Sequence, residues 1–148
     1  MLFHLATGYA LQAIADLPEG DDYVMTRDLA ERLSLPAPFL SKILQNLARA
    51  GILESSRGAK GGFRLGRPAE RITVQEVLVA LEGEGSLDRC VMGFPTCDPE
   101  QPCPLHDAWS TVKTQMLDSL ATTSVADLRR AALAKLEKGK GAVGPIRR

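Results

Sequence analysis

Residues 26–65 read TRDLAERLSLPAPFLSKILQNLARAGILESSRGAKGGFRL, and this stretch decides the fold. Thr26 is of a type that caps helix N-termini, and it stands before a short helical segment over residues 27–33. A second helix is predicted to start near Pro38 and to end at Gly51, because glycine readily adopts the conformation that closes a helix. Two short helices in succession are typical of a helix-turn-helix.

A wing follows the second helix. Residues 52–55 and 63–65 are short extended segments, and a basic, glycine-rich turn over residues 57–62 joins them, which predicts two strands with a flexible tip. Upstream, a first helix is predicted from apolar residues at helical spacing, namely Phe3, Ala6, Tyr9, Ala10, Ala13, Ile14 and Leu17. The predicted fold is mainly α with a small β-wing, a winged helix-turn-helix.

The second helix has one apolar side, and its polar side consists of Ser41, Lys42, Gln45, Asn46 and Arg49. Hydroxyl and amide side chains can read base edges in a major groove, while Lys42 and Arg49 can reach bases or phosphates. In the wing, Arg57 or Lys60 could enter the narrower minor groove. The same pattern also fits a helix face that is merely solvated, or a winged helix that binds protein.

The chain has no net charge, but its charges are divided between two blocks. Residues 27–71 carry nine Lys or Arg against four Asp or Glu, whereas residues 72–106 carry one against six. A basic block followed by an acidic block indicates two separate functions, and the positive charge of the basic block suits DNA binding. No apolar stretch approaches the roughly 18 residues of a membrane span, and the N-terminus lacks the basic start of a signal sequence. We therefore expect a cytoplasmic protein with no membrane partner.

All three cysteines and one of the two histidines lie in one short segment, in the order Cys90, Cys97, Cys103 and His106. Glycine and four prolines interrupt it, so it should be a loop. Thiolates select zinc, copper(I) or iron–sulfur clusters, and a neutral imidazole can complete four ligands. We favour an iron–sulfur cluster, because the cysteines are spaced more widely than in most zinc sites. Structural zinc and a metal-free thiol site are the alternatives, and an odd number of cysteines disfavours a disulfide.

The remaining chain is predicted to be helical. Residues 73–76 form a capping box that begins a helix running to Leu81, and Ser124 begins the last helix. Between them a long helix carries an apolar stripe suited to a dimer interface, formed by Leu105, Trp109, Val112, Met116 and Leu120. We divide the chain into a winged helix-turn-helix DNA-binding domain (1–82), a cysteine-rich cluster-binding loop (83–104), dimerisation and C-terminal helices (105–138) and a disordered tail (139–148).

Several short motifs, in this order, resemble the IscR/NsrR family of bacterial winged-helix repressors over nearly residues 1–130. They are Tyr9–Ala10–Leu11, residues 40–51, residues 57–65, residues 71–77, and Cys103–Pro104–Leu105–His106 with Trp109. Members are dimeric transcription factors that sense iron–sulfur status, nitric oxide or redox state, or cysteine metabolism in cluster-free branches. The resemblance implies a homodimer that binds double-stranded DNA at a palindromic operator.

The resemblance also implies roles for single residues. Ser41, Lys42 and Gln45 fall where members read the major groove, and Arg57 and Gly58 fall at the wing contact. The three cysteines fall on the cluster cysteines of the family.

One position departs from the family pattern. Members that hold a four-iron cluster take a carboxylate ligand from the partner subunit, at the residue before Tyr9, and here that residue is Gly8. His106 matches the histidine that completes a two-iron cluster in the iron–sulfur-assembly regulator. A 2Fe–2S cluster with His106 as fourth ligand is therefore favoured, and a 4Fe–4S cluster is the alternative. His4 could reach a partner's cluster, but we expect it to be packed or exposed.

These features together predict a repressor whose operator binding is controlled by an iron–sulfur cluster. A cluster-free or zinc-bound thiol-based regulator is the first alternative. An iron–sulfur electron carrier or cluster-handling protein would explain the cysteines but not the basic wing. An enzyme is not expected, because the chain has neither a phosphate-binding glycine loop nor a Ser-His-Asp arrangement.

Overall fold

The computed structural model describes residues 3–137, so the predicted tail of residues 139–148 lies outside the described part of the chain. Its helices and strands are α1 (Leu5–Asp16), α2 (Thr26–Leu33), α3 (Ala37–Arg49), β1 (Leu53–Ser56), β2 (Gly62–Leu65), α4 (Val74–Glu82), α5 (His106–Thr122) and α6 (Val125–Glu137). Short 3-10 turns at Ala69–Arg71 and Ser86–Asp88 precede and follow α4. The predicted class, mainly α with a small β-wing, is confirmed.

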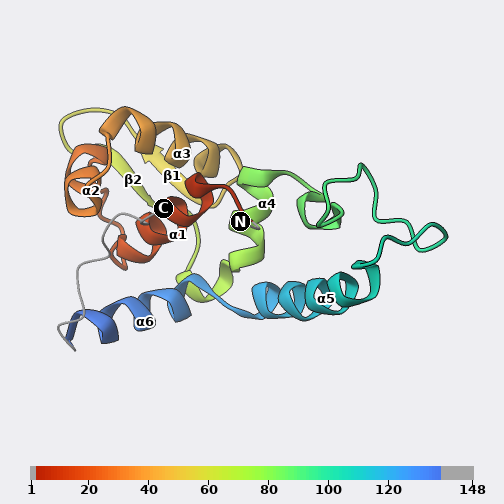
Figure 1. Ribbon diagram of the computed structural model, residues 1–148. Coiled ribbons are helices and arrows are strands. Elements are labelled where there is room, and N and C mark those ends of the chain that lie inside the picture. The colour runs from red at the N-terminus through yellow and green to blue at the C-terminus, as the bar shows by residue number, and fades with distance from the viewer. Residues whose placement is uncertain (1–2, 138–148) are drawn as a thin grey trace.

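The core lies between α1, α2, α3 and the base of the wing, and α4 and α6 close it with Val77, Val125 and Ala126 (Figure 1). Ala10, Ala13 and Ile14 of α1 are fully buried, and Leu40 and Leu44 of α3 pack in the same cluster. Alanine is small, so α1 can approach its neighbours closely and exclude water from the leucines. The buried face of α3 therefore fixes its polar face toward solvent.

The wing is a hairpin held at both edges of its second strand. β1 and β2 pair antiparallel, with Leu53 opposite Leu65 and Ser56 opposite Gly62. On the other edge of β2, Val24 and Phe63 exchange two backbone hydrogen bonds of 2.9 Å. The segment before α2 therefore acts as a third, very short strand.

Local signals set most helix ends close to the predicted residues. Phe3 and Leu105, which were predicted on helices, lie just before α1 and α5. The capping box of α4 is present, because Thr73 Oγ1 accepts from the Glu76 N–H at 3.2 Å and Glu76 Oε2 accepts from the Thr73 N–H at 2.8 Å. The prediction of Thr26 as an N-cap was wrong, since Met25 occupies that position and Thr26 is the first helical residue. The Met25 carbonyl accepts from the Asp28 and Leu29 N–H groups, so the helix begins directly after the Val24–Phe63 bridge, one residue earlier than predicted.

The C-terminal helices follow each other along one side of the molecule (Figure 1). α6 packs along α1, and the Val74 N–H to Thr123 O and Val125 N–H to Ile72 O bonds, 2.9 and 2.8 Å long, attach its start to the start of α4. α5 contacts α4 and then extends away from the winged domain, with the cysteine-containing loop at its far end (Figure 1).

The attachment of the wing generates the first prediction. A Cβ added at Gly62, where φ is +137°, would lie 2.0 Å from the Val24 carbonyl oxygen. We expect Gly62→Ala to lower the free energy of unfolding by about 2–4 kcal/mol, because it adds a backbone clash to the strain of a positive φ. Gly58→Ala is the control, since its φ is +103° but no atom lies within 4 Å of the added Cβ. Equal losses in thermal unfolding would contradict this assignment.

Candidate functional site

The polar face of α3 is exposed and internally ordered. Lys42, Gln45 and Arg49 are exposed, whereas Ser41 and Asn46 are half-buried. Gln45 Nε2 donates to Ser41 Oγ at 3.2 Å, and an Arg49 guanidinium nitrogen donates to Asn46 Oδ1 at 3.1 Å. Pairs one turn apart restrict the rotamers of these side chains. The helix therefore presents a partly preorganised row of donors and acceptors.

A groove of about 800 Å³ separates α3 from the wing and reaches the N-terminus of α2. Its lining residues are Met25, Thr26, Arg27, Gln45, Ala48, Arg49, Ser55, Ser56, Arg57, Gly58, Gly61, Gly62 and Phe63. Three of them are arginines, and among these described lining residues none is acidic. A groove with this charge suits a polyanion.

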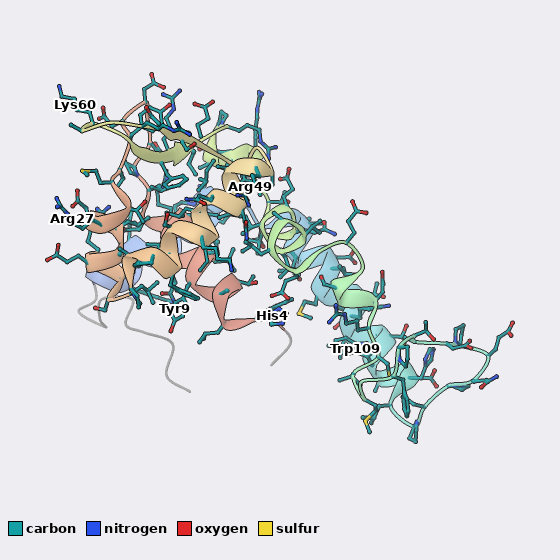
Figure 2. All side chains as sticks on the ribbon, turned by 90° about the horizontal axis from the view of Figure 1, so that it is seen from above. His4, Tyr9, Arg27, Arg49, Lys60 and Trp109 are labelled. Carbon is teal, nitrogen blue, oxygen red and sulfur yellow. The ribbon has the colours of Figure 1, made fainter. Side chains whose placement is uncertain are left out.

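The groove brings together only part of the predicted DNA-binding set. Gln45, Arg49, Arg57 and Gly58 line it. The other predicted residues, Ser41, Lys42, Asn46 and Lys60, are not among its lining residues. Lys60 lies on the exposed wing tip, on the far side of the domain from Trp109 (Figure 2).

Thr26 and Arg27 are two of the groove residues that the sequence analysis did not predict as site residues. Thr26 was interpreted only as a cap, and Arg27 was not singled out, yet both line the groove at the first turn of α2. Free backbone N–H groups at a helix N-terminus favour anions. The exposed Arg27 side chain adds a positive charge beside them, although its Nε lies 3.6 Å from Asp28 Oδ1. The sequence signal that could have predicted this site is Arg27, a basic residue in the first turn of α2, which is the first helix of the helix-turn-helix.

The four predicted metal ligands line a second hollow, of about 410 Å³, at the N-terminal end of α5. They approach one another in two pairs. Cys90 Sγ lies 3.9 Å from Cys103 Sγ, and Cys97 Sγ lies 3.4 Å from His106 Nδ1. Within residues 3–137 no group of three or more such side chains is close enough to hold a single metal ion.

The surroundings of Cys90 favour its thiolate. Hydrogen bonds from the backbone N–H of Met92, and then from those of Phe94 and Gly93, lower the pKa of the buried Cys90 thiol. The turn that aims them is closed by the Gly93 N–H bond to the Cys90 carbonyl, at 2.9 Å, with Gly93 at a φ of +84°. A thiolate is the form that binds metals.

α5 holds both ends of this loop. The Trp109 indole N–H donates to the Arg89 carbonyl at 3.1 Å, and Lys113 Nζ lies 3.3 Å from Asp88 Oδ1. At the other end, the His106 N–H donates to the Cys103 carbonyl at 3.0 Å. The loop is therefore attached to α5 at both of its ends.

The predicted dimer stripe divides into two kinds of residue. Trp109 is only 9% exposed and packs against the loop of its own subunit. Val112 is 49% exposed, and Met116 and Leu120 are half-buried. An apolar strip on a projecting helix is therefore accessible to another surface.

His4 interacts with a carboxylate of its own chain. The backbone N–H of His4 donates to Glu82 Oε1 at 2.7 Å, and the imidazole Nδ1 contacts Glu82 Oε2. Thr7 Oγ1 also donates to Glu82 Oε1, at 2.5 Å. Burial alone would raise the pKa of Glu82, but these hydrogen bonds outweigh burial and hold it below its usual value. The exposed His4 side chain agrees with the expectation from sequence.

The family model for Rrf2, described as an iron-dependent transcriptional regulator, matches residues 4–131. The chain belongs to the Rrf2 family. The transcriptional regulator IscR of Xenorhabdus nematophila is 30% identical over 122 residues, covering 81% of this chain and 74% of that protein. Members of the family are transcriptional regulators and not enzymes, and the resemblance noted in the sequence is confirmed.

Solved structures share the fold. The structure of IscR from T. potens is 27% identical, with a TM-score of 0.67, and covers 93% of this chain and 89% of that one. The structure of CymR, the global cysteine regulator of B. subtilis, has a TM-score of 0.73 at 22% identity, covering 85% of this chain and 94% of that one. This Rrf2 protein is therefore a DNA-binding transcriptional regulator of the winged-helix class. None of its described helices has the length and apolar character needed to cross a membrane.

The groove generates the second prediction. We expect Arg49→Ala to weaken binding to every DNA sequence and to reduce the slope of log K against log salt by about 0.9, the effect of losing one phosphate contact. We expect Gln45→Ala to cost about 1–3 kcal/mol on the operator alone, because an amide reads base edges. Titrations of operator and unrelated duplex at several salt concentrations measure both. Equal effects of the two variants on both duplexes would contradict the assigned roles.

Proposed function

We propose that this Rrf2 protein is a homodimeric repressor, acting in the cytoplasm, whose binding to a palindromic operator is controlled by a 2Fe–2S cluster. Cys90, Cys97, Cys103 and His106 would hold the cluster. The observation that carries the proposal is the arrangement of these four donors as two close pairs around one hollow.

The pairing supports two irons more than one zinc. A mononuclear zinc site needs all four donors around a single point, whereas each iron of a 2Fe–2S cluster takes two protein ligands. Two sulfur donors about 2.3 Å from one tetrahedral metal lie about 3.8 Å apart, and a sulfur and a nitrogen donor about 3.5 Å apart. The observed separations are 3.9 Å for the sulfur pair and 3.4 Å for the sulfur–nitrogen pair. In a four-iron cluster each ligand binds a different iron, so close pairs are not required. We assign Cys90 and Cys103 to one iron, and Cys97 and His106 to the other.

The contacts of α5 supply a route from the loop to DNA. When bound, the cluster supplies redox-sensitive chemistry, and a histidine ligand raises the potential relative to a full thiolate set. The loop residues Arg89 and Asp88 contact Trp109 and Lys113, so a change in loop shape shifts α5. α5 packs on α4, which follows the wing directly.

A dimer places two recognition helices on one operator. Half-sites of a palindrome lie about 34–36 Å apart, so a small rotation between subunits weakens binding. The stripe of Val112, Met116 and Leu120 on α5 supports an interface between two copies. Trp109 contributes by holding the loop against this helix.

A cluster-free thiol-based or zinc-bound regulator is the second candidate. The likeness in fold to CymR, named a cysteine regulator, favours it. Visible absorption, with iron, zinc and sulfide analysis of protein purified without oxygen, separates the candidates, because zinc is a filled-shell ion. A colourless protein without iron or sulfide would contradict the cluster.

The third prediction concerns the ligands. We expect Ala at Cys90, Cys97 or Cys103 to abolish the cluster, because each loss removes an anionic thiolate. His106→Ala should leave a weakened cluster with altered absorption, since water can partly replace a neutral ligand, and His106→Cys should lower the potential. An unchanged spectrum and potential in His106→Ala would show that another group is the fourth ligand.

The fourth prediction concerns the dimer. Met116→Glu should yield monomers, because a charge in an apolar interface is left unpaired. Monomers should also bind the operator more weakly. In a dimer, binding of one subunit raises the effective concentration of the other at the second half-site, and a monomer loses this gain. Gln115→Glu, an exposed neighbour on the same helix, is the control. A Met116→Glu dimer unchanged in sedimentation would locate the interface elsewhere.

A further inference from the structure

Arg64 of β2 is a basic residue of the wing whose guanidinium is occupied by protein partners. Its Nε and Nη2 donate to Glu54 Oε2 at 2.9 and 2.7 Å. Its Nη1 donates to Asp21 Oδ1 at 3.0 Å and to the Asp21 carbonyl at 3.1 Å. Its Cζ also lies 4.8 Å from the centre of the Tyr23 ring. Glu54 is in the wing, but Asp21 and Tyr23 belong to the loop between α1 and α2.

Arg64 lies on the wing face that turns away from the groove. Arg64 and its cross-strand partner Glu54 line a different hollow and are not among the groove residues. The adjacent pair, Ser55 and Phe63, lines the groove, which Ser56 and Gly62 at the end of the hairpin also reach. Successive side chains of a strand point to opposite faces, so Arg64 and Phe63 face opposite ways. The hollow on the Arg64 side is lined by four acids, Glu19, Asp21, Glu54 and Glu70, against two arginines, Arg64 and Arg67. Its excess of acidic side chains is less favourable to phosphate than the groove, where no acid is among the described lining residues.

The loop that Arg64 grips is itself anchored. Arg129 of α6, only 11% exposed, donates from Nη2 to the Leu17 carbonyl at 2.5 Å and from Nη1 to Glu19 Oε1 at 2.8 Å. At its other end the loop continues into Val24, which is bonded to Phe63. A clamp to an anchored loop can set the angle of the wing.

We propose that Arg64 is a wing-positioning residue, which clamps the wing to the loop over residues 17–24 so that Arg57 and Lys60 lie correctly for DNA, and does not itself contact a phosphate. The inference rests on the DNA-binding activity of the protein. It gives Asp21 and Glu54 a role in DNA binding, although both are acidic.

The sign of the effect of these acids provides the test. Removing a negative charge from a DNA-binding protein should tighten binding by simple electrostatics. The clamp requires the opposite, so Asp21→Ala and Glu54→Thr should both weaken operator binding. The loss should be about fivefold or more for Glu54→Thr, because Glu54 forms the shorter ion pair with Arg64. Asp22→Ala and Glu70→Ala are matched controls, because these acids are nearby but form no ion pair among the described residues. Their operator affinity should stay equal or rise.

Arg64 variants complete the experiment, with full-length protein and a duplex from the promoter region of its own gene. Arg64→Ala should weaken binding without changing the slope of log K against log salt. Loss of a phosphate contact would instead reduce the magnitude of that slope by about 0.9. Arg64→Lys should restore binding only in part, because one ammonium cannot bridge both carboxylates as a planar fork does. Combining Arg64→Ala with Glu54→Thr should add little to either single change.

Amide hydrogen exchange distinguishes local release of the wing from a general loss of stability in a variant. The Val24 and Phe63 N–H groups should exchange faster in Arg64→Ala, while those of α1 stay protected. Tighter or unchanged operator binding by Glu54→Thr and Asp21→Ala would overturn the proposal, as would a lowered salt slope in Arg64→Ala. Absence of binding by the unsubstituted protein would instead contradict the proposed function, so the two failures are distinguishable.

Discussion

Two backbone hydrogen bonds between Val24 and Phe63 hold together the DNA-binding end of this Rrf2 protein. They place the segment before α2 at the edge of β2, and so bring the N-terminus of α2, the end of α3 and the wing around one groove. Gly62 is required there because a side chain would collide with the Val24 carbonyl. The same contact keeps Met25 extended and delivers Thr26 and Arg27 to the groove.

The opposite end of the molecule is organised by α5. This helix carries His106 in its first turn and, through Trp109 and Lys113, holds the chain just before Cys90. If the four donors share a cluster, its loss frees a loop that is attached to α5 at both ends. The winged domain and the donor loop are far apart (Figure 2), so their communication has to pass through helix packing.

Local patterns predicted the elements well because their causes are local. The capping box over residues 73–76 is two reciprocal bonds within one turn, and the turn over residues 57–62 combines glycines with two short strands. The N-cap of α2 is Met25 and not Thr26, and it lies directly after the Val24–Phe63 bridge, a contact between residues far apart in the sequence. Arg64 and Arg57 are both basic wing residues, and they are distinguished only by the different hollows that they line and by the contact of Arg64 with the distant Asp21.

The sequence by itself determined the winged helix-turn-helix, the cysteine loop and the family, since spacing, turn residues and motif order are properties of neighbouring residues. Only the tertiary structure decided that Trp109 packs on the cysteine-containing loop of its own chain, that the predicted metal ligands form two pairs, and that Glu82 accepts a hydrogen bond from His4. These contacts join residues from different elements or from distant points of one loop. They depend on how the chain packs, and periodicity carries no information about that.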